Sequence, residues 1–141
     1  NVISTETQDV DGGKVGDAAQ ITARLGIDMK LAENVSFDTD VRFYDELYSD
    51  VGAVKENLLL PSFHVWDAGL SYKMYLGADD EKSLNIRVNV NNVSDAVYLS
   101  ELRTNIAAGE GSGELYNGID TANQGYFGLG RTWNVGLRYK F

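Results

Sequence analysis

Residue types that commonly carry out catalysis are sparse in this sequence. The 141 residues contain one histidine, His64, and no cysteine, which excludes a thiolate nucleophile and a cysteine-ligated metal site. A catalytic histidine also needs partners that activate a nucleophile, and no such set accompanies His64. The sequence therefore predicts that the protein is not an enzyme.

Two short motifs resemble ligand-binding loops but are incomplete. Asp9, Asp11 and Gly12 match part of a calcium-binding loop, whose remaining ligands are missing. The glycine-rich run GEGSGE at residues 109–114 lacks the strand and helix that flank a phosphate-binding loop. We therefore expect no metal and no cofactor, and we interpret residues 109–114 as a flexible loop.

The composition favours strands and tight turns. Fifteen glycines stand against one proline, and the chain has eight tyrosines and five phenylalanines. With 43% hydrophobic residues, there is enough apolar material for one domain with a core. The longest aliphatic run is Leu58 to Leu60, which excludes a membrane-spanning helix.

Apolar and polar residues alternate with a period of two over five stretches. Leu84, Ile86, Val88 and Val90, for example, alternate with polar residues at every intervening position. Such a pattern predicts antiparallel strands with two different faces. The five predicted strands cover residues 18–31, 35–44, 63–76, 84–93 and 127–141.

The connections between these strands alternate in length and differ in charge. Short turns join the first to the second strand and the third to the fourth, whereas long segments cover residues 1–17, 45–62 and 94–126. Residues 1–17, 45–62 and 99–125 hold twelve acidic and three basic residues, which accounts for the whole net charge of −9. Short turns at one end and long external loops at the other are typical of outer-membrane barrels. The predicted fold is therefore an all-β, antiparallel transmembrane barrel.

A barrel wall assigns each face of a strand to one environment. We expect lipid on the apolar side and the barrel lumen on the polar side. The lipid-facing set is Ile86, Val88, Val90, Val135 and Leu137, and the lumen-facing set is Asn85, Arg87, Asn89, Asn134 and Arg138. Aromatic girdles are expected from Phe43, Trp66 and Phe127 at the outer interface and from Tyr72, Tyr75, Tyr139 and Phe141 at the inner interface.

Several motifs resemble those of TonB-dependent outer-membrane receptors. The run VNVNNVSDAVY at residues 88–98 is similar to the motif of their penultimate strand, with Asn91, Asn92, Asp95 and Tyr98 in the matching places and Ser94 departing from it. LPSFHVWDAGLSYK at residues 60–73 resembles the preceding strand. The terminus with Gly130 and Arg131 resembles that of the family, and LYSDV at residues 47–51 adds a likeness to receptors of Bacteroidetes. Asn134, Gly136, Tyr139 and Phe141 resemble the C-terminal assembly signal of bacterial outer-membrane proteins.

The resemblance implies a part of a larger protein. Receptors of this class have about 22 strands and a plugged lumen, so residues 1–141 would supply the last five strands, beginning inside an external loop and without the plug. The implied function is uptake of a scarce nutrient (siderophore, haem, cobalamin or glycan) across the outer membrane of a Gram-negative bacterium, energised by the TonB system. Implied partners are the remainder of the barrel and its plug, the TonB complex, the outer-membrane assembly machinery, lipid and lipopolysaccharide, and a surface lipoprotein. Nucleic acid is not among them.

Ligand selectivity is expected in the long loops, because they can vary without disturbing strand pairing. In these loops and on the strand ends at their bases, the residues with aromatic surface or hydrogen-bonding capacity are Tyr44, Tyr48, His64, Arg103, Tyr116 and Asn117. Structural packing is the alternative interpretation for them. Two other functions remain open. One is a small complete barrel with a structural or adhesion role, and the other is a soluble β-sandwich that acts as a binding module.

Overall fold

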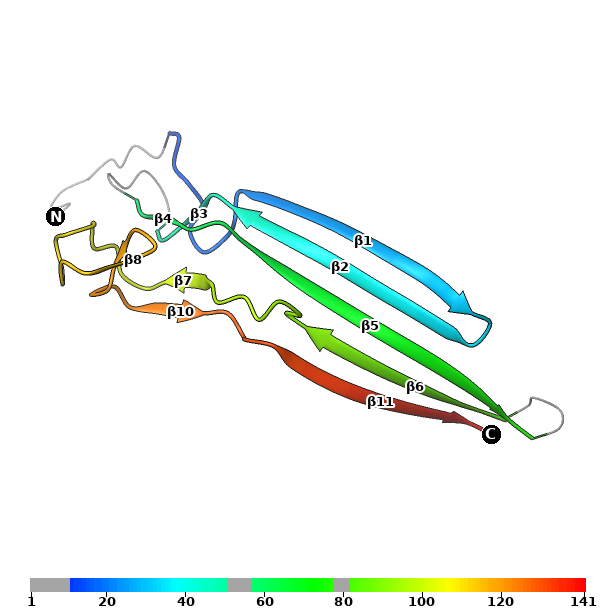
Figure 1. The fold of residues 1–141 in the computed structure, drawn as a ribbon. Helices are drawn as coiled ribbons and strands as arrows, with labels where there is room; N and C mark the ends of the chain where they lie inside the picture. Colours follow the sequence, from blue (N-terminus) through cyan, green and yellow to red (C-terminus); the bar gives the residue numbers. More distant parts are fainter. Residues whose placement is uncertain (1–10, 51–56, 78–81) are drawn as a thin grey trace, which may run out of the picture. The chain divides into compact units, whose positions relative to one another are not determined.

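The computed structural model describes residues 11–50, 57–77 and 82–141, in which strands alternate with turns and no helix occurs (Figure 1). No helix in these residues is long and apolar enough to cross a membrane. The fold is all-β with antiparallel pairing, as the alternation predicted. Residues 1–10, 51–56 and 78–81, which fall in two predicted loops and one predicted turn, lie outside the described residues.

The chain forms two compact units. The sheet unit comprises Thr22–Phe43, Phe63–Tyr98 and Gly128–Phe141, and the loop unit comprises Asn1–Ile21, Tyr44–Ser62 and Leu99–Phe127. The long strands of the sheet unit pair in the order β1-β2-β5-β6-β11. These strands are β1 (Ile21–Ala32), β2 (Val35–Asp45), β5 (Phe63–Leu76), β6 (Lys82–Asn91) and β11 (Thr132–Lys140).

The strand register separates an apolar face from a polar face. Val88 of β6 lies opposite Leu70 of β5 and Val135 of β11. Its neighbour Arg87 lies opposite Ser71 and Gly136, on the other side of the sheet. The predicted division of residues 85–90 and 134–138 into two faces agrees with this register. The division holds over these residues because successive side chains of a strand point to opposite faces.

One predicted girdle residue lies on the wrong face. Tyr72 pairs with Ile86 on the apolar face, but Tyr75 pairs with Ser83 and therefore points to the polar face. There the Lys73 ammonium lies 4.6 Å from the centre of the Tyr75 ring. The prediction was wrong because an odd spacing of three residues reverses the side of a strand.

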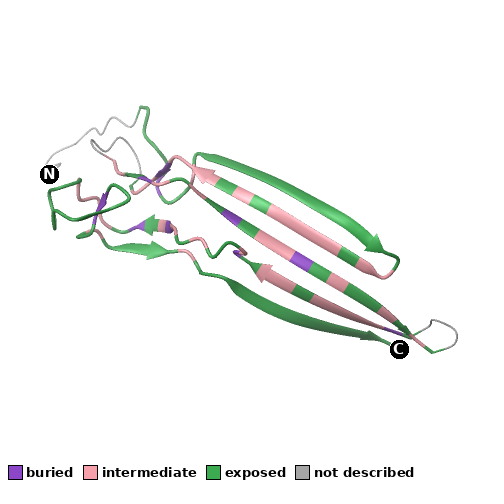
Figure 2. Cartoon of the chain, in the orientation of Figure 1, coloured by how far each residue is buried: buried purple, intermediate pink, exposed green. Residues whose placement is uncertain are grey.

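Many apolar side chains of the sheet unit are exposed on its apolar face. Leu25, Trp133 and Leu137 expose 74%, 73% and 70% of their surface. The edge strands β1 and β11 are exposed along their whole length, β2 and β6 are mostly half-buried, and β5 alternates between exposed, half-buried and buried residues (Figure 2). Among the described apolar residues of this unit, Val65 alone is buried.

The loop unit contains paired strands that the sequence did not predict. Its strands are β3 (Leu47–Tyr48), β4 (Leu59–Leu60), β7 (Leu99–Leu102), β8 (Leu115–Tyr116), β9 (Ile119–Asp120) and β10 (Gly125–Phe127). They pair as β3 with β4, β7 with β10 and β8 with β9. Its buried apolar side chains are Leu47, Leu60, Leu99, Leu102 and Ile119. The described core thus lies mainly in segments that were expected to be plain loops.

Several predicted strand ends also shift. The first strand begins at Ile21 rather than at residue 18, and the fourth begins at Lys82 rather than at residue 84. The strand predicted to end at residue 93 ends at Asn91, because Asn92 adopts a left-handed backbone with φ of 52°. The strand predicted to begin at residue 127 begins at Thr132. Phe127 instead pairs with Leu99 in the loop unit.

Candidate functional site

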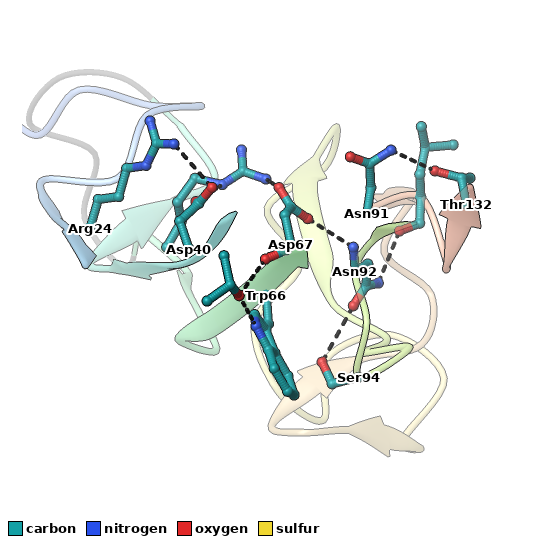
Figure 3. Close-up of polar contacts among 11 residues, drawn as sticks. Arg24, Asp40, Trp66, Asp67, Asn91, Asn92, Ser94 and Thr132 are labelled. Atoms are coloured by element: carbon teal, nitrogen blue, oxygen red, sulfur yellow. Dashed lines mark hydrogen bonds and ion pairs between the residues drawn. The ribbon is translucent and has the colours of Figure 1, made fainter. Parts of the chain in front are cut away.

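Alternating charges cross the polar face of the sheet unit (Figure 3). Arg24 of β1 bonds Asp40 of β2 at 3.0 Å, and Arg42 lies 3.6 Å from the same carboxylate. Arg42 also forms an ion pair with Asp67 of β5, whose second oxygen accepts the Asn92 backbone N–H at 2.8 Å. Each of these carboxylates already holds a partner, so the row is suited to fixing strands together rather than to acid–base chemistry.

Asn92 connects the exit of β6 to the chain that leads into β11. Its side-chain amide donates to the carbonyls of Ala96 and Leu129 at 2.9 and 3.1 Å. Its side-chain oxygen accepts the Ala96 N–H at 2.9 Å. The residue is buried and its left-handed backbone is one that asparagine tolerates better than most residues.

The remaining motif residues extend this connection. Asp95 accepts the Arg131 N–H at 2.8 Å, and the Arg131 guanidinium approaches the same carboxylate at 3.4 Å. The Tyr98 ring stacks on Phe63, with centroids 4.2 Å apart. The Asn91 side-chain amide donates to the Thr132 hydroxyl at 3.1 Å. We call Asn91, Asn92, Asp95, Tyr98, Gly128, Gly130 and Arg131 the motif cluster.

Within the motif cluster, sequence reasoning named Gly130 but missed Gly128. The Gly128 N–H donates to the Tyr98 carbonyl at 2.9 Å, and a Cβ added at Gly128 would overlap the Tyr98 ring. A Cβ at Gly130 would lie 3.3 Å from Asp95 Oδ1, a much milder contact. The bonds of this cluster join residues 91–98 to residues 128–131, at the two ends of segment 99–127.

Another ion pair lies further along the polar face. Arg87 of β6 donates to Asp38 of β2 at 2.9 Å and to Ser71 of β5 at 3.0 Å. The pair passes directly over Gly69, where an added Cβ would lie 2.6 Å from the guanidinium. Gly69 therefore gives room for an ion pair between strands that are not adjacent to each other.

The six predicted ligand residues are distributed over both units. His64 is exposed on β5, and Tyr44 is half-buried near the end of β2. Tyr48 of β3 is half-buried, with the Lys14 ammonium 5.3 Å from its ring centre. Arg103 follows β7 and is exposed. Their contact with a ligand remains a prediction.

The other two, Tyr116 and Asn117, belong to the β8–β9 hairpin. Asn117 and Gly118 form its two-residue turn, with φ of 48° and 88°. Positive φ at both positions is the reason that Asn-Gly is a strong hairpin signal between apolar residues. The sequence contained this signal at residues 115–120, and sequence reasoning missed it.

The Asp120 carboxylate organises the glycine-rich run that was interpreted as a flexible loop. Backbone N–H groups of Ala122 and Ser112 donate to Oδ1 at 2.9 Å each, and the Ser112 hydroxyl donates at 2.8 Å. The N–H groups of Gly109, Gly111 and Gly113 donate to Oδ2 at 3.2 to 3.3 Å. These bonds, above all that from Ala122, hold the pKa of Asp120 well below its usual range. The interpretation as a flexible loop was therefore wrong.

An apolar pocket lies beside Asp120 in the loop unit. It encloses about 290 Å³ and is lined by Leu99, Leu102, Tyr116, Ile119, Asp120, Thr121, Asn123, Gly125 and Phe127. Tyr116 and Phe127 meet edge to face there, with ring centroids 5.7 Å apart. Of the six predicted ligand residues, Tyr116 lines this pocket.

The calcium-like motif is described only in part. Asp9 lies outside the described residues, and Asp11 and Gly12 form a turn. In residues 11–50, 57–77 and 82–141, no group of three or more histidine or carboxylate side chains is arranged to hold a metal ion. No protein-family model, curated protein or solved structure matches the chain.

Proposed function

We propose that the chain forms part of the wall of an outer-membrane barrel of the TonB-dependent type, which takes up a scarce nutrient from outside the cell. The observation that carries this proposal is a five-stranded sheet with a bare apolar face and an ion-paired polar face. The proposal assigns the apolar face to lipid and the polar face to the lumen.

Burial supports the lipid assignment. Leu60 in the loop unit exposes 2% of its surface, whereas Leu25 in the sheet unit exposes 74%. Exposed apolar surface costs about 25 cal/mol per Å² in water, and a continuous apolar patch normally has a partner. In hydrocarbon this cost disappears, while the polar face still holds charges that lipid could not solvate.

The strand edges support further strands on both sides. β1 and β11 are the edges of the sheet, and each has a row of backbone groups without a neighbour in the sheet unit. In lipid an unsatisfied backbone group costs several kcal/mol, so an open edge there is not tolerated. The proposed partners at the two edges are other strands of the same barrel.

The receptor class rests on the motif cluster. Its residues resemble the family pattern in sequence. Bonds of Asn92, Tyr98 and Arg131 join residues 91–98 to residues 128–131, at the two ends of segment 99–127. Such a connection leaves a long segment free to vary above a fixed attachment. Neither alternative, a soluble sandwich or a small adhesion barrel, would explain why these motifs occur together.

Single-cysteine variants test which face of the sheet contacts lipid. They are suitable because residues 1–141 contain no cysteine that would also take up the label. Spin labels are placed at Val88, Val135, Asn89 and Asn134 in the complete protein, reconstituted in liposomes. Labels at the two valines are expected to be relaxed by dioxygen and shielded from a water-soluble nickel chelate, and labels at the two asparagines should show the reverse. Equal nickel accessibility at all four positions would refute the lipid assignment.

Transport is tested by loop shortening. Removal of residues 109–123 from the complete receptor should weaken nutrient uptake by cells while its amount in the outer membrane is unchanged. The matched control is replacement of 109–123 by a glycine-serine linker of equal length, which should show the same loss of uptake. Full uptake in both variants would show that residues outside 109–123 select the ligand.

A further inference from the structure

The pocket of the loop unit has an unusual pairing of an apolar lining with a buried charge. Leu99, Leu102 and Ile119 form its buried wall, and Tyr116 and Phe127 expose 38% and 54% of their surface. The Asp120 carboxylate lies in the same wall and is 1% exposed. The pocket therefore combines a hydrophobic interior, an accessible aromatic pair and a fixed negative charge.

The charge of Asp120 is stabilised but not neutralised. Its six donors are neutral N–H and O–H groups, which supply dipoles rather than a counter-charge. No basic side chain of the described residues forms a salt bridge with it. The surrounding segment adds to the negative potential, because residues 99–125 hold four acidic residues and one basic residue.

Other ligand chemistries fit this pocket poorly. The Asn123 side chain already bonds Ile106 through both its amide and its oxygen, and it also accepts the Thr104 hydroxyl. Both Asp120 oxygens are likewise in use, so neither residue can offer the unused polar groups that a sugar or a phosphate requires. An anion would in addition meet the charge of Asp120.

We infer that the pocket binds a small organic cation that carries an apolar or aromatic group. The apolar group enters among Leu99, Leu102 and Ile119. The cationic group lies at the aromatic pair, where the ring face of Tyr116 or Phe127 attracts it. This inference rests on the proposed function only for access to the pocket from outside the cell.

The test measures the affinity of four probes for the complete protein in detergent by isothermal titration calorimetry. Benzyltrimethylammonium combines ring and cation, benzyl alcohol is neutral, phenylacetate is an anion, and tetramethylammonium is a cation without the ring. Benzyltrimethylammonium should bind about tenfold or more tightly than phenylacetate, and more tightly than the other two probes. Equal affinity for all four, or tightest binding of phenylacetate, would overturn the inference.

Variants locate the binding. Tyr116→Ala should weaken benzyltrimethylammonium binding roughly 2- to 30-fold, whereas Tyr116→Phe should retain most of it. Tyr126→Ala is the matched control, because Tyr126 is an exposed aromatic of β10 that does not line the pocket. Loss of affinity in Tyr126→Ala, or none in Tyr116→Ala, would place the cation elsewhere and reject this site. Because binding in detergent needs no transport, its failure is distinguishable from a failure of the spin-label or uptake experiments.

Discussion

At the scale of single residues, the motif cluster depends on two features. One is the space that Gly128 leaves for a ring, and the other is the set of hydrogen bonds that Asn92 makes with backbone groups. Gly128 lies against the Tyr98 ring, and that ring stacks on the Phe63 ring. Asn92 satisfies backbone groups of Ala96 and Leu129 that lie on separate segments. Alanine at position 128 would force the Tyr98 ring to move, and alanine at position 92 would leave these backbone groups without their partner.

Gly128→Ala should destabilise the folded protein by about 1–3 kcal/mol, because the new Cβ must displace a stacked ring. The measurement is equilibrium unfolding by urea in the presence of lipid. Gly136→Ala is the matched control, since a Cβ there lies 4.0 Å from the nearest atom. Equal stability of the two variants would show that Tyr98 moves aside freely.

Asn92→Ala should cost about 1–3 kcal/mol, because it leaves the Ala96 N–H and the carbonyls of Ala96 and Leu129 without their partner. The neighbouring Asn91→Ala loses one exposed bond to Thr132 and should cost less than about 1 kcal/mol. The same unfolding experiment compares them. An equal loss in the two variants would contradict the central role of Asn92.

At the scale of elements, Asp120 acts as the centre of the segment from Gly109 to Ala122. Because its pKa is lowered in the folded state, the ionised carboxylate stabilises this segment above the unfolded pKa of about 3.9. That contribution diminishes as the pH falls below this value, and it is lost when the pH passes through the folded pKa.

Amide NMR spectra of the complete protein should therefore show the signals of residues 109–122 unchanged from pH 7 to pH 5 and increasingly broadened below about pH 4. Asp120→Asn should broaden them already at pH 7, because its NH₂ group faces N–H donors. Glu110→Gln, an exposed carboxylate in the same segment, is the control and should leave the spectra unchanged. Sharp signals in Asp120→Asn at pH 7 would contradict this role.

The long strands were predictable from sequence because alternation acts residue by residue. The alternation fixes which face each side chain takes, because a one-residue slip would reverse it. A two-residue slip would not, so the pairing of Val88 with Leu70 and Val135 was not predicted. The organisation of the loop unit was not predicted, since it depends on contacts between residues distant in sequence. Asn105, for example, accepts the Leu58 N–H across 47 positions. The β8–β9 hairpin is the exception, because Asn117-Gly118 is a local signal.

At the scale of the whole molecule, the proposal assigns opposite environments to adjacent residues of one strand. Val135 and Asn134 are neighbours on β11, both exposed, and lie on opposite faces. In water, an arginine at either position would be tolerated about equally, since surface substitutions usually change stability by less than about 0.5 kcal/mol. In a membrane barrel, the two positions should differ strongly.

Val135→Arg should destabilise the complete barrel in a bilayer by about 2–4 kcal/mol, because the guanidinium must leave water or deform the surrounding lipid. Asn134→Arg should cost less than about 1.5 kcal/mol, mainly the loss of its 2.9 Å bond with Asn89, because a lumen-facing guanidinium stays hydrated. Unfolding by urea from liposomes of matched thickness gives both values. Repeating the comparison in a thinner bilayer should reduce the cost of Val135→Arg and leave that of Asn134→Arg unchanged, since only the first depends on depth in the hydrocarbon. If Asn134→Arg were the more costly variant, the polar face would be the one in contact with lipid, and the proposed function would fail with it.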